Sequence, residues 1–381
     1  MEVDKPVVYE YIDSENKLKT ACRSLSKEKR IAVDLEADSL YHFQEKVCLI
    51  QMSANGSNFV LDPLAIPDLS PLAPLFADGN IQKIFHGADY DIRSLYRDFG
   101  IVINNLFDTE LASRFLGVAS TGLDAVVNDH LGISLDKKYQ KKDWSVRPLP
   151  SEMIDYAAGD VMYLLPISAT LMDALERKDR INWVFEECDL LSNVRPVSND
   201  AQPLFLKIKG AGRLSPRALA TLENILNIRQ EVARKKDRPL FKVFSNRAAL
   251  ALAAACPMTL DALKETGVLS KHQSSMYGSH IVTCIQKAME MPENTLPSYP
   301  RNRKPRPSAD VSPRIKTLQE WRNTKSEALG MDAGLICNRS LATRLAVVNP
   351  SRVEEMNAIE EMKGWQKAAF GEEILAVLGK G

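Results

Sequence analysis

The sequence is poor in the residues that form disulfide frameworks and zinc sites. Its six cysteines and five histidines are scattered over 381 residues, and no two cysteines form a C-x-x-C pair. Scattered cysteines in a chain of this length are typical of reduced core residues in a cytosolic protein. A metal site in this protein would therefore have to be built from carboxylates.

Long hydrophobic runs are also absent. No apolar stretch approaches the roughly 20 residues that a membrane-spanning helix needs. Residues 1–5 lack the basic start and the apolar core of a signal peptide. We therefore expect a cytoplasmic protein that does not bind membranes. With 45% hydrophobic and 26% charged residues, the chain is expected to form two or three globular domains.

A formal net charge of zero hides a division between the two halves of the chain. Residues 1–200 contain 21 Lys and Arg against 32 Asp and Glu, a net charge of −11, whereas residues 201–381 contain 28 against 17, a net charge of +11. An acidic half suits a carboxylate metal site, and a basic half suits a polyanionic partner. Surface charge also drifts between domains without functional meaning, so the charge alone leaves both interpretations open.

The first candidate site residues lie on an expected strand. Residues 31–36, with the sequence IAVDLE, alternate between apolar and other side chains, which is typical of a strand with one face in a core. This pattern places Asp34 and Glu36 side by side on the opposite face, where two like charges repel. A hard divalent cation such as Mg²⁺, which takes oxygen ligands, would relieve that repulsion. The alternative is a strand end that runs into a solvated loop.

The first 200 residues are expected to form an α/β domain. The Asn55-Gly56 turn lies between two runs of strong β-formers and predicts a hairpin. Three antiparallel strands are therefore expected to come first, and the later ones to follow a βαβ pattern covered by helices. The expected strands cover residues 7–12, 31–36, 47–53, 59–61, 81–86 and 106–109, and the expected helices cover residues 14–29, 92–99, 109–117, 122–131 and 151–164.

Further candidate residues lie at the end of a strand and on a late helix. Asp91 follows a strand, and in α/β sheets such strand ends face the ligand crevice. Tyr156 and Asp160 are four residues apart on an expected helix and so share one face. Asp160 interrupts an otherwise apolar stripe, which is costly unless the carboxylate is paired or binds a metal. The alternatives are a helix N-cap for Asp91 and a packed aromatic for Tyr156, and His86 is expected to support the site by hydrogen bonding without being a ligand.

The second half of the chain changes to a nearly pure helical texture. It is expected to divide into a first helical module, a linker rich in proline and arginine, and a second helical module, at residues 206–291, 292–309 and 310–381. The modules align loosely, with Arg229 and Asn246 of the first corresponding to Arg322 and Asn338 of the second. We interpret them as diverged repeats of one module.

Together and in this order, the candidate residues resemble the pattern of the DEDD-type 3′→5′ exonucleases, which is Asp-x-Glu, an Asp after the next buried strand, and Tyr-x-x-x-Asp on a late helix. The resemblance is to the ribonuclease D family and extends to residues 86–92, 108–112, 142–144, 147–149 and 156–161. The two helical modules resemble HRDC domains, the second more loosely than the first. The resemblance implies a ribonuclease H-like α/β exonuclease domain over residues 1–200, followed by two all-α helical-bundle (HRDC) domains.

The resemblance also implies roles for individual residues. Asp34, Glu36, Asp91 and Asp160 would hold two Mg²⁺ or Mn²⁺ ions, and Tyr156 would orient the attacking water. The implied reaction removes nucleoside 5′-monophosphates from the 3′ end of RNA. The implied substrate is structured RNA with a free 3′-hydroxyl, such as a tRNA precursor.

Two other functions and one side-chain role stay open at this point. A 3′→5′ DNA exonuclease is one alternative, although the chain contains no helicase or polymerase sequence. A non-catalytic nucleic-acid-binding scaffold is the other, although all five site residues are present. The basic segment 137–142 and Trp144 are candidates for contacts with the backbone and bases of the RNA, and Trp144 packing beneath its own loop is an equal alternative.

Overall fold

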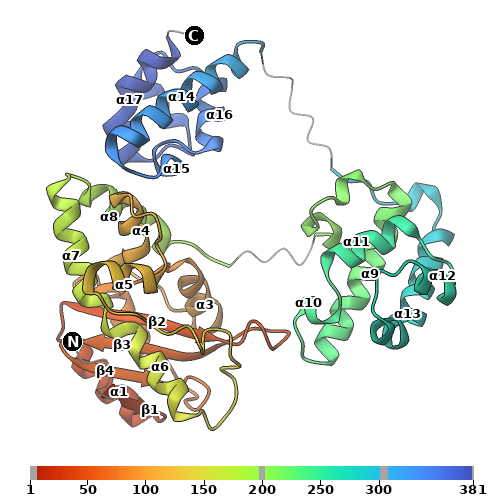
Figure 1. Ribbon diagram of the computed structural model, residues 1–381, viewed down its shortest axis with the longest axis horizontal. Coiled ribbons are helices and arrows are strands. Elements are labelled where there is room, and N and C mark those ends of the chain that lie inside the picture. The colour runs from red at the N-terminus through yellow and green to blue at the C-terminus, as the bar shows by residue number, and fades with distance from the viewer. Residues whose placement is uncertain (1–6, 197–201, 301–307, 380–381) are drawn as a thin grey trace. The chain divides into compact units, whose positions relative to one another are not determined.

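The structure is a computed structural model that describes residues 7–196, 202–300 and 308–379. By packing, these residues divide into two units. The first unit contains residues 7–36, 47–196 and 308–379, and the second contains residues 37–46 and 202–300. The second helical module thus belongs to the same packing unit as the α/β domain (Figure 1).

A six-stranded sheet in the order β1-β4-β3-β2-β5-β6 forms the centre of the α/β domain. Its strands are β1 (Glu10–Ile12), β2 (Arg30–Ala37), β3 (Val47–Ala54), β4 (Ser57–Leu61), β5 (Gln82–Phe85) and β6 (Leu106–Asp108). The predicted hairpin is confirmed, because β3 and β4 are antiparallel and Asn55 and Gly56 take the positive φ angles, 46° and 83°, that a two-residue turn requires. Strand β5 pairs in parallel with β2 and β6, as a βαβ pattern requires.

The expectation of antiparallel pairing is wrong for β1. This strand lies at the edge of the sheet and pairs in parallel with β4, with Glu10 opposite Phe59. Because α1, β2 and β3 intervene between the two strands, no tight turn sets the direction in which β1 joins the sheet. It is also shorter than expected, since it begins at Glu10.

Helices cover the sheet and reach beyond the last one that the sequence predicts. They are α1 (Glu15–Leu25), α2 (Leu72–Ala77), α3 (Asp89–Phe99), α4 (Thr109–Leu116), α5 (Leu123–Leu131), α6 (Ser151–Met162), α7 (Leu164–Arg177) and α8 (Ile181–Ser192). Helix α6 packs on β3 and β4, α7 on β5, and α8 on β6. Helices α7 and α8 lie beyond the expected helices, because their mixed apolar and charged residues give no clear boundary after α6.

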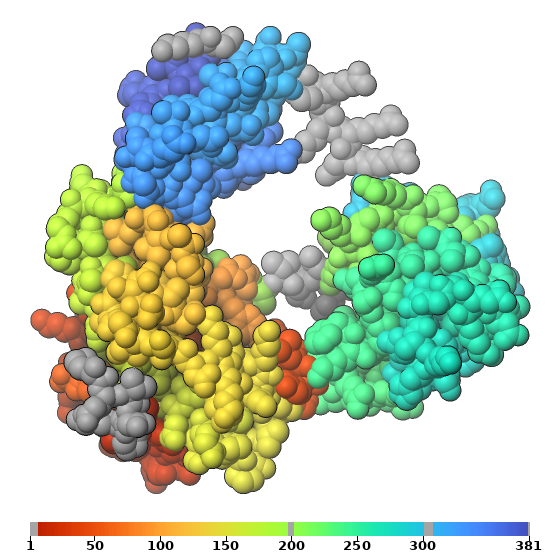
Figure 2. Space-filling view, in the orientation of Figure 1, coloured from red at the N-terminus to blue at the C-terminus, as the bar shows by residue number. Residues whose placement is uncertain are grey.

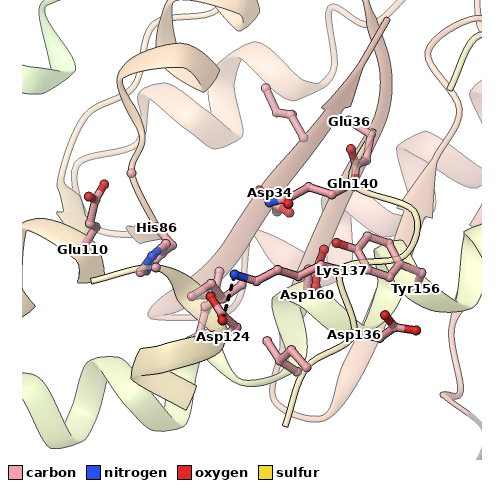
Figure 3. Close-up of a pocket in the computed structure, with 16 residues that line it drawn as sticks. Asp34, Glu36, His86, Glu110, Asp124, Asp136, Lys137, Gln140, Tyr156 and Asp160 are labelled. Atoms are coloured by element: carbon pink, nitrogen blue, oxygen red, sulfur yellow. Dashed lines mark ion pairs between the residues drawn. The ribbon is translucent and has the colours of Figure 1, made fainter. Parts of the chain in front are cut away.

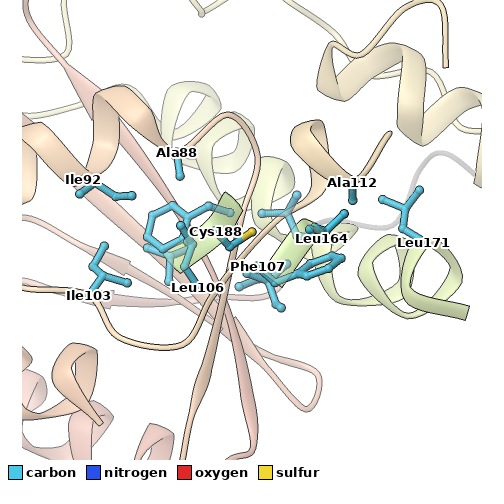
Figure 4. Close-up of a cluster of buried hydrophobic side chains, with 14 of the residues drawn as sticks. Ala88, Ile92, Ile103, Leu106, Phe107, Ala112, Leu164, Leu171 and Cys188 are labelled. Carbon is cyan, nitrogen blue, oxygen red and sulfur yellow. The ribbon is translucent and has the colours of Figure 1, made fainter. Parts of the chain in front are cut away.

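The end of strand β6 lies within the core of the domain. Leu106 and Phe107 pack among side chains from α3, α4, α7 and α8, including Ile92 and Cys188 (Figure 4). The Cys188 thiol also accepts a hydrogen bond from the backbone N–H of Asp108 at 3.3 Å. This packing determines where β6 ends and therefore where α4 begins.

Both helical modules are built alike. The first contains α9 (Pro216–Lys235), α10 (Leu240–Val243), α11 (Asn246–Ala255), α12 (Leu260–Glu265) and α13 (Lys271–Glu290), with the 3₁₀ turns Leu204–Lys207, Ala211–Arg213 and Glu293–Thr295 beside them. The second contains α14 (Val311–Leu329), α15 (Ala333–Ile336), α16 (Arg339–Val348), the 3₁₀ turn Val353–Ala358 and α17 (Gly364–Leu378). None of the helices in the described ranges is long and apolar enough to cross a membrane.

Equivalent contacts support the interpretation of the modules as repeats. Arg229 on α9 donates to the backbone carbonyl of Phe244, and Arg322 on α14 donates to that of Cys337, each just before the next long helix. Helices α11 and α16 both end on a left-handed residue, Cys256 or Asn349, and a proline follows in each case.

The second helical module packs directly on α4 and α8 of the α/β domain. Trp365 stacks on Trp183 with ring centroids 4.9 Å apart. The Glu186 carboxylate accepts hydrogen bonds from the first N–H groups of α17, where the helix dipole favours a negative charge. Glu187, largely buried, pairs with Lys363 and accepts a hydrogen bond from the Trp365 indole at 2.8 Å. Figure 2 shows this module, in blue, against the orange and yellow-green helices of the same packing unit.

Two glycines offer a matched test of this packing. Gly117 and Gly132 both end helices with positive φ, but a Cβ on Gly117 would lie 2.0 Å from the Gly330 carbonyl oxygen of the second module, whereas nothing lies within 4 Å of one on Gly132. We expect Gly132→Ala to lower the free energy of unfolding by about 1 kcal/mol through backbone strain. Gly117→Ala should lower the free energy of unfolding by about 3 kcal/mol, because the second helical module must also shift. Calorimetric unfolding of both variants measures this, and equal losses would contradict the packing.

Candidate active site

A pocket of about 420 Å³ lies at the edge of the sheet where β2 and β5 end. Its sixteen lining residues come from β2, from the turns before α3 and α5, from the first residues of α4, α5 and α7, from the loop before α6 and from α6 itself (Figure 3). Four of the five predicted site residues line it: Asp34, Glu36, Tyr156 and Asp160. Segments more than 100 residues apart in the chain thus form one acidic cavity.

Strand β2 carries the first two carboxylates. It is an interior strand between β3 and β5, and Ile31, Ala32 and Val33 are all fully buried. The expectation of a strand with one face in a core therefore does not describe residues 31–33, because an interior strand of a covered sheet buries both faces. Asp34 and Glu36 follow on the face toward the pocket, only partly exposed to solvent.

The fifth predicted residue, Asp91, lies behind the pocket wall. It is in the first turn of α3, and its side chain is buried, so it is not a helix N-cap. Asp108, at the end of β6, holds this turn by accepting hydrogen bonds from the N–H groups of Gly87 and Ala88 at 3.0 and 2.8 Å. Asp108 also caps α4, so one buried carboxylate joins the starts of two helices.

Helix α6 contributes Tyr156 and Asp160 from the other side. The Tyr156 hydroxyl donates a hydrogen bond to Asp160, and its ring packs on Trp144 and Tyr139 at centroid distances of 6.2 and 5.7 Å. Trp144 is only 1% exposed. The interpretation of Trp144 as a base-contacting residue is therefore wrong: it lies beneath its loop and supports the Tyr156 ring.

An arginine anchors the loop that carries Trp144. Arg147 makes two hydrogen bonds with the Asp62 carboxylate, both of 2.7 Å, and donates further ones to the carbonyl groups of Trp144 and Cys48. Bidentate arginine–carboxylate pairs of this kind combine strength with a defined geometry. The loop is therefore attached to β3 and to the end of β4 immediately before α6 begins.

Burial and the charges of neighbouring carboxylates raise the pKa values of the acidic site residues. Burial raises the pKa of Asp34 to about 6, and burial together with the Asp34 charge raises that of Asp160 to about 8. The pKa of Glu36 is raised well above its ordinary value by burial and by the charges of Asp34, Asp160 and Asp91. The pKa of Asp91 is also raised, by burial and by Asp34 and Asp108. Four acidic groups thus share one desolvated region.

Burial and the same acidic groups raise the pKa of Tyr156 above its ordinary value. At neutral pH the phenol therefore keeps its proton, which it donates to Asp160. A protonated tyrosine in this position can orient a nearby group by hydrogen bonding but cannot accept a proton.

The four carboxylates fit a metal by their chemistry more than by their present arrangement. Among the described residues, no three His, Cys, Asp or Glu side chains are arranged as a ready ligand set. The carboxylates nevertheless suit hard divalent cations, which take oxygen ligands and would relieve the repulsion that raises the pKa values. We therefore conclude that the pocket fits divalent ions once the side chains are drawn toward them.

Other polar and charged residues line the pocket beside the predicted catalytic residues. They are Glu110, Asp124, Asp136, Lys137 and Gln140, together with His86. The Thr109 hydroxyl donates to the Phe85 carbonyl and is also hydrogen bonded to His86 Nδ1, at 2.9 Å in each case. Burial lowers the pKa of His86, so the ring is neutral. The supporting role expected for His86 agrees with these contacts. Lys137 belongs to the basic segment 137–142, a candidate for contacts with RNA, whereas no sequence pattern marked Asp124.

Known proteins share both the sequence pattern and the fold. The 3′-5′ exonuclease family matches residues 9–176, and the HRDC domain family matches residues 218–285 and 312–378. Ribonuclease D of Escherichia coli K12 is 28% identical over 367 residues, covering 96% of this chain and 97% of that protein. Ribonuclease D of Granulibacter bethesdensis is 28% identical over 365 residues, covering 94% of this chain and 90% of that protein.

Solved structures agree with these relatives. The crystal structure of E. coli RNase D, described as an exoribonuclease involved in structured RNA processing, matches with a TM-score of 0.74 and 26% identity over 98% of this chain and 99% of that one. The catalytic core of RRP6 from Trypanosoma brucei (mutant C496S) matches with a TM-score of 0.65 and 31% identity over 77% of this chain and 83% of that one.

The mixed sheet, its covering helices and the acidic pocket define a 3′→5′ exonuclease domain, the class whose DEDD members generally depend on divalent metal ions. The helical modules are HRDC domains. The chain belongs to the ribonuclease D family of 3′→5′ exoribonucleases.

The raised pKa values predict how stability depends on pH. Between about pH 4, where the unfolded carboxyls titrate, and about pH 8, these four carboxyl groups bind more protons in the folded protein than in the unfolded chain. We therefore expect the melting temperature of the metal-free protein to fall by several degrees as the pH rises through this range, and Mg²⁺ or Mn²⁺ to restore it most at the upper end.

Two variants control this prediction. Asp160→Asn should reduce the decrease in melting temperature with rising pH, because it removes one of the titrating groups. Asp89→Asn should not reduce this decrease. The pairing of Asp89 with Arg93 lowers the pKa of Asp89, so this group makes stability rise with pH instead of fall. Melting curves that stay level or rise with pH in the metal-free wild type would contradict the prediction.

Proposed function

We propose that this exoribonuclease removes nucleotides from the 3′ end of RNA by metal-assisted hydrolysis, with Asp34, Glu36, Asp91 and Asp160 holding two Mg²⁺ or Mn²⁺ ions. The observation that carries the proposal is the mutual electrostatic coupling of these carboxylates, which come from three separate elements. Such an arrangement is unfavourable without cations and becomes favourable with them. When bound, the ions would supply an activated nucleophile and stabilise the leaving 3′ oxygen.

The protein's own groups position the reactants. The Tyr156 hydroxyl, already hydrogen bonded to Asp160, orients the attacking water, and its raised pKa argues against a role as general base. Trp144 holds the ring from behind. Asp108 fixes the turn from which Asp91 faces Asp34 and Glu36, so it is a positioning residue.

The substrate proposal is structured RNA with a free 3′-hydroxyl, such as a tRNA precursor, with nucleoside 5′-monophosphates as products. It is supported by the E. coli relative, which is described as an exoribonuclease involved in structured RNA processing. A cytoplasmic location belongs to the same proposal and is consistent with the six free cysteines.

We further assign different tasks to the two HRDC domains, with domain limits at residues 1–200, 206–291 and 310–381 and a linker at 292–309. Residues 206–291 contain 14 Lys and Arg against 6 Asp and Glu, a net charge of +8, whereas residues 310–381 contain 10 of each. The neutral second domain already packs on α4 and α8. The first domain therefore carries the charge suited to binding the RNA backbone.

An assay of 3′-end trimming tests the proposed reaction. With Mg²⁺ or Mn²⁺, we expect stepwise shortening of a 5′-labelled RNA, little shortening of the DNA analogue, and none of the same RNA with a 3′-phosphate. Asp34→Asn should lower kcat by at least about 10³-fold while RNA binding persists, because the variant lacks one metal ligand. Preferential trimming of DNA would favour the alternative nuclease, and binding without trimming would favour a scaffold.

Two variants make this test specific. Asp129→Asn removes an exposed carboxylate of α5 that does not line the pocket, and it should keep the wild-type rate. Tyr156→Phe keeps the ring against Trp144 and removes only the hydroxyl. It should lower kcat by about 10²-fold with little change in KM, and a near-normal kcat would remove Tyr156 from the mechanism.

Paired charge variants test the division between the HRDC domains. Replacing exposed Lys209 and Lys235 of the first domain by Gln should weaken RNA binding, with kcat at saturating RNA unchanged. The slope of log K against log salt should fall by up to about 0.7 for each RNA phosphate that the variant no longer neutralises. Replacing exposed Arg339 and Arg344 of the second domain should change the binding less. Equal effects on the salt slope would contradict the assignment.

A further inference from the structure

One cation stands among many carboxylates in the active-site pocket. Of the sixteen described residues that line the pocket, six are Asp or Glu, and Lys137 is the single Lys or Arg. An RNA 3′ end must bring phosphates into this acidic surrounding. Divalent ions can neutralise the four-carboxylate site, but a neighbouring phosphate outside their reach needs another positive partner.

The Lys137 side chain is held across the pocket. In Figure 3 it extends from the loop before α6, between Asp34 and Asp160, and ends at Asp124. Its Nζ lies 2.8 Å from Asp124 Oδ2, and the lysine side chain is 58% exposed while that of Asp124 is 35% exposed. The ammonium group is thus directed into the pocket and accessible to an incoming ligand.

Asp124 is well placed to hold this lysine. It lies in the first turn of α5, after the N-cap Gly122, where the helix dipole favours its charge. The lysine in turn lowers the pKa of Asp124. The pair therefore joins two walls of the pocket, α5 and the loop before α6, and keeps a positive charge at a defined point above the carboxylates.

We infer that Lys137 is a phosphate-binding residue that Asp124 positions, and that its ammonium group contacts a non-bridging oxygen of a backbone phosphate beside the scissile one. This inference rests on the proposed function, since it assigns an additional contact to the same RNA substrate. A simple ion pair that only staples the loop to α5 is the competing explanation.

Neutral phosphate analogues distinguish the two explanations. A set of short RNAs, each with one methylphosphonate among the last four linkages, is bound to the full-length Asp34→Asn protein, which does not degrade them. With Lys137 present, neutralising one particular linkage should weaken binding about tenfold, as expected for a charge-assisted hydrogen bond. In the Lys137→Met background, a methylphosphonate at that linkage should weaken binding no more than one at a neighbouring linkage.

The comparison variant is Lys138→Met. It removes the same charge from the same loop, but its ammonium group lies over the Tyr139 ring, 5.1 Å from the centroid, and it does not line the pocket. It should weaken all the RNAs equally and leave the position-specific effect in place. Lys137→Arg, which keeps the charge, should recover most of the affinity.

Kinetic and thermal measurements in the otherwise wild-type chain complete the test. Lys137→Met should raise KM about tenfold, with a smaller change in kcat. Asp124→Asn should raise KM less, and the double variant should be no worse than Lys137→Met, because Asp124 acts through the lysine. All three should keep the melting temperature within about 2 °C, as exposed ion pairs contribute little stability.

Two results would overturn the inference. One is an unchanged methylphosphonate profile in Lys137→Met. The other is an equal drop of melting temperature in Lys137→Met and Asp124→Asn that accounts for the decrease in activity. Both differ from failure of the proposed function itself, which would appear as absence of 3′-end trimming by the wild-type protein.

Discussion

Repulsion among four carboxylates that are largely removed from solvent is the constraint on which this structure depends. Asp34 and Glu36 lie two residues apart on an interior strand, and Asp91 and Asp160 approach from two helices, so that the charge of Asp34 raises the pKa of the other three. A pocket of this kind stores unfavourable energy that binding of cations releases. The cost is confined to one edge of the sheet, and the rest of the domain must hold the acidic groups there.

The supporting structure holds them through a few polar anchors within an apolar core. Asp108 joins the turn before α3 to the start of α4, and Arg147 joins the loop before α6 to Asp62. Behind these anchors, Phe107 and Cys188 pack in the core (Figure 4). The second HRDC domain extends this support, because Arg180 donates to the carbonyl of Phe115 at the end of α4 and to that of Leu329 in the module.

The two HRDC domains share internal contacts but differ in their surfaces. Both keep an arginine that binds the chain before the third helix, and both end that helix on a left-handed residue before a proline. Their surfaces have diverged, since one has a net charge of +8 and the other is neutral and packs through Trp365. The shared contacts maintain the fold, while the surface charge and the aromatic residues at the packing interface differ between the two domains.

Local patterns in the sequence determined much of this protein: the alternation in β2, the Asn55-Gly56 hairpin, the spacing of Tyr156 and Asp160, and the repeat of the helical modules. These features depend on neighbours within a few residues, which is why they can be predicted. The tertiary structure alone decided the parallel pairing of β1, the burial of Trp144, the bracing role of Asp108 and the meeting of Asp124 with Lys137. Each of these depends on contacts between distant segments, and such contacts arise only when the whole core packs and brings those segments together.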